Sequence, residues 1–521
     1  MALDCGGESA TDRASLRLEQ GNHALNLVWF KRDLRVQDHE PLAQAAARGP
    51  IIPLYILEPE LWQQPDASQR QWQFVRDSLV SLARSLEQLG QPLWIIQGEA
   101  TQVLASLVER HAIQQVYAHM ETGNGWTYQR DLTVHRRLRA LGVPFYEYRQ
   151  HGVIRGLELR QGWASQWEAL MAEPQSQVSA LTGPGPGPFE LPSHWATQDM
   201  TPCEVQSGGS EPGKALLDSF LTERGREYTR QMSRPESGAQ ACSRLSPHLA
   251  YGTLSLRAVL QRLRATEAPD SVWARSYRSL DKRLHWHCHF IQKLESEPRM
   301  EFEALHRDFL DLHSEPADDE VIERWIEGQT GWPFVDACMR ALKATGWINF
   351  RMRAMLVALS SYHLWQPWQT PAHRLAQRFV DYEPGIHYSQ FQMQSGTTGI
   401  NVNRMYNPIK QSRDQDPDGS FIRRWVPELA GYSNDWIHEP WRAPQALQRR
   451  MGAQVGKHYV APIADPVQAA RDAKARLTAF IHSRDLKPEA QRILKQHASQ
   501  MRQTRPKYAK SGTSTQQTLD F

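Results

Sequence analysis

The hydrophobic pattern of this 521-residue chain changes completely across one proline- and glycine-rich stretch. Before it, short apolar runs alternate with amphipathic segments. After it, strand-like runs nearly vanish, and helical stretches rich in Trp, Arg and His follow. The stretch itself, at about 180–213, reads TGPGPGPFELPSHW and then QSGGSEPG, which breaks both periodicities. Because the chain is also too long for one ordinary core, we predict an α/β domain, a connector and a mainly α-helical domain.

The expected boundaries follow these changes of pattern. We expect a disordered extension over 1–23, an α/β domain over 24–155, a connector over 156–214, a helical domain over 215–480 and a basic tail over 481–521.

Within the α/β domain, five apolar runs are typical of buried strands: LNLVWF, IIPLYIL, PLWIIQG, QQVYAHM and PFYEYR. The amphipathic stretches between them, such as 68–89 and 101–111, are typical of helices. This alternation predicts a parallel sheet covered on both faces, with ligands beyond the carboxyl ends of the strands. No G-x-G-x-x-G follows the first strand, so a Rossmann dinucleotide site is not expected.

The cysteines, the apolar runs and the charges of the chain argue against several classes of protein. The five cysteines are scattered without a C-x-x-C pair, which argues against a disulfide framework or a zinc ribbon and favours a reducing cytoplasm. No apolar run reaches the roughly 18 residues of a membrane span. The polar first 23 residues do not resemble a secretory signal. Residues 449–510 hold 14 Lys and Arg against 4 Asp and Glu, which suits either a nucleic-acid contact or a solvated helical face.

Four sequence words, in order, resemble the photolyase/cryptochrome family. They are VWFKRDLRVQD at 28–38, SRLSP at 243–247, WIEGQTGWPFVDACMRALKATGWINFRMR at 325–353 and NPIKQSRDQDPDGSFIRRWVPEL at 407–429. The resemblance covers about 25–440 and points to a divergent bacterial-type branch that resembles DNA photolyases. It implies FAD bound in the helical domain.

Around the cofactor, the resemblance implies a phosphate site at Ser243, Arg244, Leu245 and Ser246. Hydroxyls, backbone N–H groups and a guanidinium suit a pyrophosphate, although an ordinary helix N-cap would also explain the serines. Tyr228 resembles the family tyrosine that packs on the outer end of the cofactor.

At the flavin ring, Arg353 and Asp381 resemble the family's arginine–aspartate pair. A fixed cation there would stabilise the anionic reduced flavin. Glu383 stands where the family usually has another carboxylate, and Asn349 belongs to the segment that lines the flavin edge, where the family's M-H-N is Ile348-Asn349-Phe350.

At the lesion site, Trp286 resembles the family tryptophan that stacks on a flipped pyrimidine dimer. The family glutamate beside it is Arg283 here, which cannot accept a hydrogen bond but can contact a carbonyl or a phosphate. The histidines at 285, 287 and 289 do not share one helix face, so we expect no metal site.

Three further positions depart from the family. The asparagine that faces the flavin N5 aligns with His387, which could donate a proton. The three tryptophans that photoreduce the flavin align with Phe391, Trp368 and Glu315, so only the middle one remains. We therefore expect photoreduction by a non-standard route.

The resemblance implies a light-driven repair enzyme, a deoxyribodipyrimidine photo-lyase, in which excited reduced FAD donates an electron to a cyclobutane pyrimidine dimer. The alternatives are a cryptochrome-type blue-light receptor that repairs nothing, and repair of (6-4) photoproducts. A second antenna chromophore, a folate or a deazaflavin, is left open.

We expect a monomer whose main partner is damaged DNA. A second partner is suggested by the last six residues, QQTLDF at 516–521, from Gln516 to Phe521. They resemble the short peptides that dock on a sliding clamp. A solvated terminus without function is the alternative.

Overall fold

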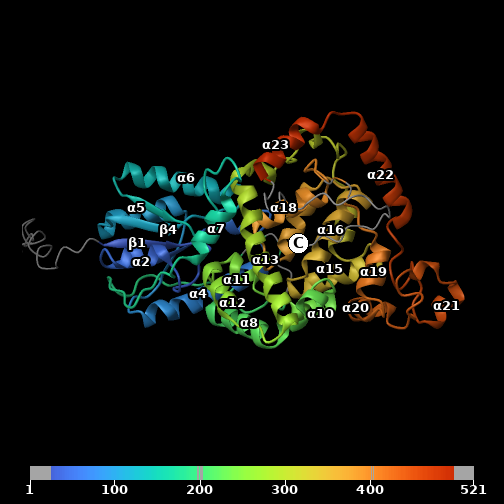
Figure 1. Ribbon diagram of the computed structural model, residues 1–521, viewed down its shortest axis with the longest axis horizontal. Coiled ribbons are helices and arrows are strands. Elements are labelled where there is room, and N and C mark those ends of the chain that lie inside the picture. Colours follow the sequence, from blue (N-terminus) through green and yellow to red (C-terminus); the bar gives the residue numbers. More distant parts are fainter. Residues whose placement is uncertain are drawn as a thin grey trace, which may run out of the picture.

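The computed structural model describes residues 25–497, except 196, 198, 200–202, 401 and 403. The clamp-like peptide therefore lies outside the described residues. Figure 1 shows an α/β domain at one end of the molecule and a larger helical domain at the other. This is the predicted fold class.

The five predicted strands are confirmed, and in the described part of the chain they form one parallel sheet in the order β3-β2-β1-β4-β5. Their bounds are β1 Asn26–Phe30, β2 Ile51–Leu57, β3 Trp94–Gln97, β4 Gln115–His119 and β5 Phe145–Tyr148. Every residue of β1 and β2 is buried, as expected for central strands covered on both faces.

Helices cover the two faces of this sheet. They are α2 Glu40–Ala46, α3 Pro59–Trp62, α4 Gln69–Gln88, α5 Ala100–His111 and α6 Gly125–Ala140. Gln71 helps to set the start of α4, because its Oε1 accepts a hydrogen bond from the backbone N–H of Ser68 at 3.2 Å. Two apolar cores result, one on each side of the sheet.

The segment that we expected to be a connector contains one helix. α7 (Trp163–Ala172) buries Trp163, Trp167 and Met171 against α12 and its neighbours. The remainder of 156–209 has no helix among its described residues.

The helical domain begins at α8, a few residues before the expected boundary. Its helices are α8 Ser210–Thr222, α9 Tyr228–Gln231, α10 Pro235–Ala241, α11 Ser246–Ala250, α12 Leu256–Ala265, α13 Ser271–Ser296, α14 Asp319–Ile326, α15 Pro333–Thr345, α16 Phe350–Ala358, α17 Gln369–Arg378, α18 Pro384–Gln394, α19 Pro408–Gln415, α20 Ser420–Trp425, α21 Gln445–Arg450, α22 Pro466–His482 and α23 Lys487–His497. A π-helical turn at Leu359–His363 follows α16, and short 3-10 turns lie at Arg224–Glu227, Pro298–Glu301, Arg307–Phe309, Pro427–Leu429 and Pro440–Arg442.

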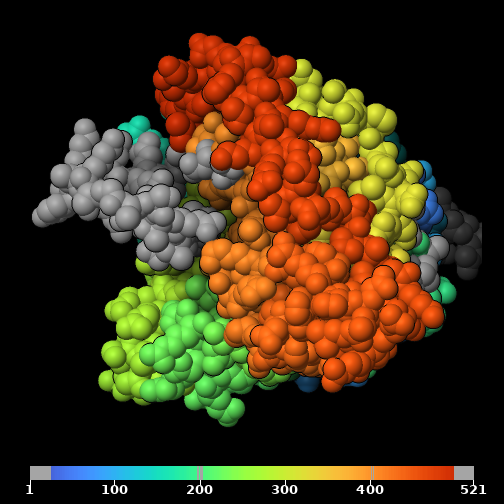
Figure 2. All heavy atoms as spheres, turned by 90° about the vertical axis from the view of Figure 1, so that its right-hand side faces the viewer, coloured from blue at the N-terminus to red at the C-terminus, as the bar shows by residue number. Residues whose placement is uncertain are grey.

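α22 and α23 lie across the outside of the helical domain, above the segment that carries α19 to α21 (Figure 2). α23 falls within the predicted basic tail and packs against the end of α13, where Arg492 pairs with Glu297 at 3.2 Å. Among the described residues, no helix is long and apolar enough to cross a bilayer.

Backbone and side-chain hydrogen bonds join the two domains. Leu34 N donates to Tyr251 O at 3.1 Å, and Arg35 Nη1 donates to Gly252 O at 2.9 Å. The carboxyl end of β1 therefore rests on the loop after α11.

Candidate functional site

The helical domain holds a cavity of about 790 Å³ between α9 to α11, α13, α16 and the segment around α19. This volume lies within the range of roughly 300–1,000 Å³ that cofactor sites occupy. Of the residues predicted for the site, those lining the cavity are Tyr228, Ser243, Arg244, Leu245, Ser246, Arg283, Trp286, Asn349, Arg353, Asp381 and Glu383.

One end of the cavity is formed by the loop that enters α11. Arg244 has a φ of 62°, a backbone conformation that is uncommon for a residue with a side chain and tends to occur at binding sites. Its guanidinium carbon lies 4.2 Å from the centre of the Trp347 ring, and its Nε is buried without a partner. With Ser243 and Ser246 beside it, this end can bind a phosphate group.

Tyr228 lies at the same end and is buried. Its ring meets that of Phe220 edge to face at 5.4 Å. Burial raises the pKa of Tyr228 to about 12, so its hydroxyl stays protonated and can donate to an anion.

The predicted ion pair lies deeper in the cavity. Arg353 Nη2 is 2.5 Å from Asp381 Oδ1, and both side chains are buried. The guanidinium also sits 3.6 Å from the centre of the Phe379 ring, which holds its plane in place. Asn349 anchors the neighbouring wall by donating from Nδ2 to Met232 O at 2.9 Å.

Several polar atoms of this deeper wall have no partner in the protein. They include Arg353 Nε and Asn349 Oδ1, which are both buried. Buried donors and acceptors are normally satisfied, so unpaired ones facing a large cavity suit a polar ligand. The residues present therefore fit the ring of a flavin at this end and its pyrophosphate at the other.

Glu383 links the cavity to the α/β domain. Its Oε2 lies 3.3 Å from Arg32 Nη2, which also donates to Tyr382 O at 2.7 Å. Burial raises the pKa of Glu383 to about 7, although the charge of Arg32 opposes the shift.

His387 and Trp368 are not among the described residues that line the cavity. His387 lies on α18, where its Nε2 is 2.9 Å from Ala372 O and its ring packs against those of Tyr382 and Phe391. Burial lowers the pKa of His387 to about 3, which favours the neutral ring. Trp368 is buried in the main core of the helical domain.

The lesion-site residues come from α13. The Trp286 ring lies at the cavity, 5.5 Å from the Phe290 ring, and packs against His289 at 4.7 Å. Arg283 Nη2 approaches Met232 Sδ at 3.7 Å.

The histidines of α13 point to different neighbours. His285 packs between Trp163 and Trp167, whereas His287 faces His151 at 6.1 Å. His289 also packs against Trp163, at 6.0 Å, so His285 and His289 share a neighbour.

Among the described residues, three other side chains do come close enough for a metal, namely Asp33, His39 and His119. All three are buried, and both histidines hydrogen-bond to Asp33, whose Oδ2 lies 2.9 Å from His39 Nε2 and 2.7 Å from His119 Nδ1. These bonds give the cluster a structural role at the end of β1.

Sequence reasoning missed part of the cavity wall. Phe290, Arg404, Tyr406, Lys410 and Gln411 line it but were not predicted as site residues. Lys410 and Gln411 lie inside the word NPIKQ, so the resemblance contained a signal for them. Phe290 and Arg404 carried no such signal.

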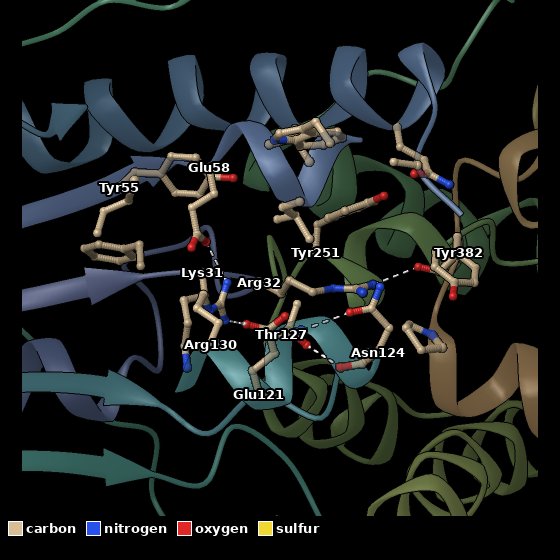
Figure 3. A pocket seen from close by; sticks show the side chains of 18 of the residues that line it. Lys31, Arg32, Tyr55, Glu58, Glu121, Asn124, Thr127, Arg130, Tyr251 and Tyr382 are labelled. Atoms are coloured by element: carbon tan, nitrogen blue, oxygen red, sulfur yellow. Dashed lines mark hydrogen bonds and ion pairs between the residues drawn. The ribbon is translucent and has the colours of Figure 1, made fainter. Parts of the chain in front are cut away.

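A second, smaller cavity lies where the α/β domain meets the helical domain, beyond the carboxyl end of β1 (Figure 3). Its volume is about 80 Å³, well below the range of cofactor sites. Arg130 reaches across it to Glu58 at 2.7 Å and Glu121 at 2.6 Å. This cavity as it stands has no room for a folate or a deazaflavin.

Comparison with known proteins agrees with this arrangement. Residues 26–162 match the DNA photolyase domain, and residues 279–479 match the FAD binding domain of DNA photolyase. The chain is 29% identical to a cryptochrome DASH of Gloeobacter violaceus over 85% of this chain and 94% of that protein. It is also 29% identical to a deoxyribodipyrimidine photo-lyase of Vibrio cholerae, over 81% of this chain and 94% of the relative.

Solved structures show the same fold. A bacterial class III photolyase from Agrobacterium tumefaciens superposes with a TM-score of 0.77 at 26% identity, covering 88% of this chain and 98% of the other. The chain thus has the α/β domain and the helical FAD-binding domain in the order of these proteins. It belongs to the photolyase/cryptochrome family.

Proposed function

We propose that this protein is a light-driven DNA repair enzyme that splits cyclobutane pyrimidine dimers. The observation that carries the proposal is that one cavity is lined both by the flavin-edge pair, Arg353 and Asp381, and by the aromatic ring of Trp286. Reduced FAD bound there would supply, on excitation, the electron that splits the dimer. A pyrimidine dimer flipped out of the duplex onto Trp286 would lie in the same cavity as that electron donor.

The chain's own residues have distinct roles in this proposal. Arg244, Ser243 and Ser246 would hold the pyrophosphate, and Tyr228 would pack on the outer end of the cofactor. Trp286 stacks on the dimer, and Arg283 contacts a carbonyl or a phosphate of the lesion. The four described cysteines are unpaired, which suits a reducing cytoplasm.

The main alternative is a blue-light receptor without repair activity. Arg283 favours it, because an acidic residue is replaced by a cation that packs against Met232. Both kinds of protein occur among the relatives, such as the cryptochrome-2 of Arabidopsis thaliana at 28% identity. A third function, repair of (6-4) photoproducts, is suggested by the neighbouring rings of His151 and His287.

Trp286→Ala tests the stacking role. Stacking on an aromatic ring contributes roughly 1–3 kcal/mol per base, so binding to dimer-containing DNA should weaken roughly ten- to a hundredfold. Binding to intact DNA depends on phosphates and should change little. The measurement is the ratio of the two dissociation constants at one salt concentration, with FAD content as a control of folding. An unchanged ratio would remove Trp286 from lesion recognition.

A further inference from the structure

Basic side chains gather at the far end of α13, beyond Trp286. Arg160 precedes α7, His289 and Lys293 lie on α13, Arg404 lies in the segment before α19, and His497 ends α23. We refer to these five residues as the basic cluster. They come from four separate parts of the chain, so the fold and not the local sequence brings them together.

Direct contacts place Arg160 against α13. Its Nη2 donates to His289 O at 3.0 Å, and its guanidinium carbon lies 4.9 Å from the centre of the Trp163 ring. The ring of Trp163 is in turn 6.0 Å from that of His289. Lys293 Nζ sits 5.3 Å from the centre of the Phe290 ring, one turn along the same helix.

Many nitrogen atoms of the basic cluster are buried without a partner in the described chain. They are Arg160 Nε and Nη1, His289 Nδ1, Arg404 Nη1, and both ring nitrogens of His497. Arg160 is 5% exposed and His289 is 2% exposed, so little water reaches their nitrogen atoms, whereas Lys293 and Arg404 are partly exposed and leave the basic cluster accessible to an anion. Such a concentration of unpaired donors at one place requires an explanation, and a bound anion is one.

Carboxylates do not neutralise this charge. Within the described residues, no carboxylate lies within 4.0 Å of Arg160, Lys293 or Arg404, and His497 only reaches 3.9 Å from Glu297. Glu297 already pairs with Arg299 and Arg492.

The neighbouring charges also act on Lys293. Burial and the positive charges of Arg160 and Arg404 lower the pKa of Lys293 to about 7. Burial likewise lowers the pKa of Arg160 to about 9. Both shifts are in the direction expected for cations that lack a counter-ion.

The basic cluster lies beside the flavin cavity. Arg404 and Phe290 line that cavity, as does Trp286. Lys293 follows Trp286 by seven residues, or about 10 Å along the helix, and faces the same side. This is within reach of the phosphate next to a base that stacks on Trp286.

We propose that Arg160, His289, Lys293 and Arg404 form a phosphate-binding site beside the flavin cavity, with His497 at its edge. The guanidinium groups and the ammonium group supply charge-assisted hydrogen bonds to phosphate oxygens. The occupant is a phosphodiester of the lesion-bearing strand or a free phosphate ion. The first source depends on the proposed repair function, whereas the second does not.

The test uses the full-length, FAD-loaded protein, in which the flavin already fills its own phosphate site. Inorganic phosphate is titrated at constant ionic strength, and binding is followed by calorimetry and thermal unfolding. Lys293→Gln and Arg160→Gln should each weaken phosphate binding roughly tenfold or more, because each removes a charged hydrogen bond. Lys282→Gln removes the same charge from an exposed position of α13 and should leave binding unchanged.

A second measurement separates a binding role from a structural one. Without phosphate, Lys293→Gln should unfold at the same temperature as the wild type or at a higher one, since it relieves repulsion within the basic cluster. A clear loss of stability in phosphate-free buffer would contradict the proposal. The proposal would also be contradicted if phosphate did not bind the wild type, or if it bound all three variants equally.

A single-stranded oligonucleotide containing a dimer then identifies the occupant. If phosphate competes with the oligonucleotide and Lys293→Gln weakens the binding of both, the occupant is a phosphate of the DNA. If both bind together, it is a free phosphate ion. Should the protein show no preference for dimers, the proposed function fails, while the phosphate titration still decides whether the site exists.

Discussion

Arg353 and Asp381 are each within reach of a polar ligand and of one another, so each depends on the other for its position. Removing either side chain leaves an unpaired buried charge beside the flavin ring, which is costly. Few other ion pairs of the helical domain are buried in this way, because most of its ion pairs lie at the surface.

We therefore expect Arg353→Ala or Asp381→Ala to lose FAD or bind it roughly ten- to a hundredfold more weakly, since one charge-assisted hydrogen bond contributes roughly 1.5–3 kcal/mol. FAD content after purification and its affinity for the apoprotein are the measurements. Arg340→Ala is the control, because it breaks a partly exposed pair with Glu428, and neither residue lines the cavity. Full FAD content in both cavity variants would show that the pair does not hold the flavin.

Glu383 should make stability depend on pH. Its pKa in the folded protein is about 7, above its ordinary value of 4.5. As the pH rises from 4.5 to 7, the unfolded chain loses this proton first, so the free energy of unfolding falls. Glu383→Gln should reduce that fall by about 1–3 kcal/mol, given about 1.4 kcal/mol per pKa unit.

Denaturant unfolding of the wild type and of Glu383→Gln across this pH range measures the difference between their free energies of unfolding. Burial raises the pKa values of Glu58 and Glu301 to about 7 as well. These two residues lower the free energy of unfolding over the same pH range in the wild type and in the variant, so their effect cancels in the difference. Glu267→Gln, at an exposed position, should keep the wild-type profile. A profile of Glu383→Gln that matches the wild type would mean that Glu383 is ionised in the folded protein.

Single residues also show where sequence reasoning reaches its limit. Arg353 and Asp381 could be predicted because both lie in or near recognisable words, and their pairing follows from their charges. His387 could be placed on the chain by counting, but the side to which α18 presents it depends on packing against Tyr382 and Phe391. Arg404 lies at the cavity only because a long irregular segment returns there.

At the scale of elements, the strands were predictable because each is a short apolar run, and the central strands β1 and β2 are buried throughout, whereas the edge strand β5 is partly exposed. The word TGWPFVD also has a physical basis, since Asp336 accepts hydrogen bonds from Thr330 N at 2.8 Å and Gly331 N at 3.0 Å and so shapes the entry to α15. α7 was missed because its stability comes from burying Trp163 and Trp167 against other helices, which a local pattern does not show.

The elements around α17 and α18 bear on photoreduction. Trp368 is buried, Phe391 packs against His387, and Glu315 is exposed and within 3.7 Å of Arg476. A chain of three tryptophans therefore does not exist at these positions. Tyr382, whose hydroxyl donates to Asp66 at 2.6 Å, and Tyr388 are buried aromatic residues nearby.

We predict that blue light and an external donor still reduce the flavin, and that Trp368→Phe slows this reaction only in part, because its usual partners are already missing. Transient absorption of the FAD-loaded protein measures the rate. Phe391→Tyr, which restores an oxidisable ring, should leave the rate unchanged or raise it. Complete loss of photoreduction in Trp368→Phe would instead show that Trp368 carries the only route.

At the scale of the whole molecule, hydrogen bonds join the two domains, and the two cavities differ greatly in size. The helical domain contains the large cavity, whereas the cavity between the domains is nearly filled by ion pairs of Arg130 (Figure 3). The order of domains and their fold could be predicted from the change of hydrophobic pattern. The way in which they pack could not, because contacts such as Arg35 to Gly252 join residues far apart in the chain.

A flavin and a DNA lesion should occupy the same cavity of the helical domain. The most direct measurement is the light-dependent loss of cyclobutane dimers from a defined oligonucleotide, by the FAD-loaded protein with its flavin fully reduced, compared with the same mixture in the dark. We expect dimers to disappear under blue light only, and Trp286→Ala to slow their loss at limiting DNA. No loss of dimers in the light, together with equal affinity for damaged and intact DNA, would contradict repair and favour a receptor.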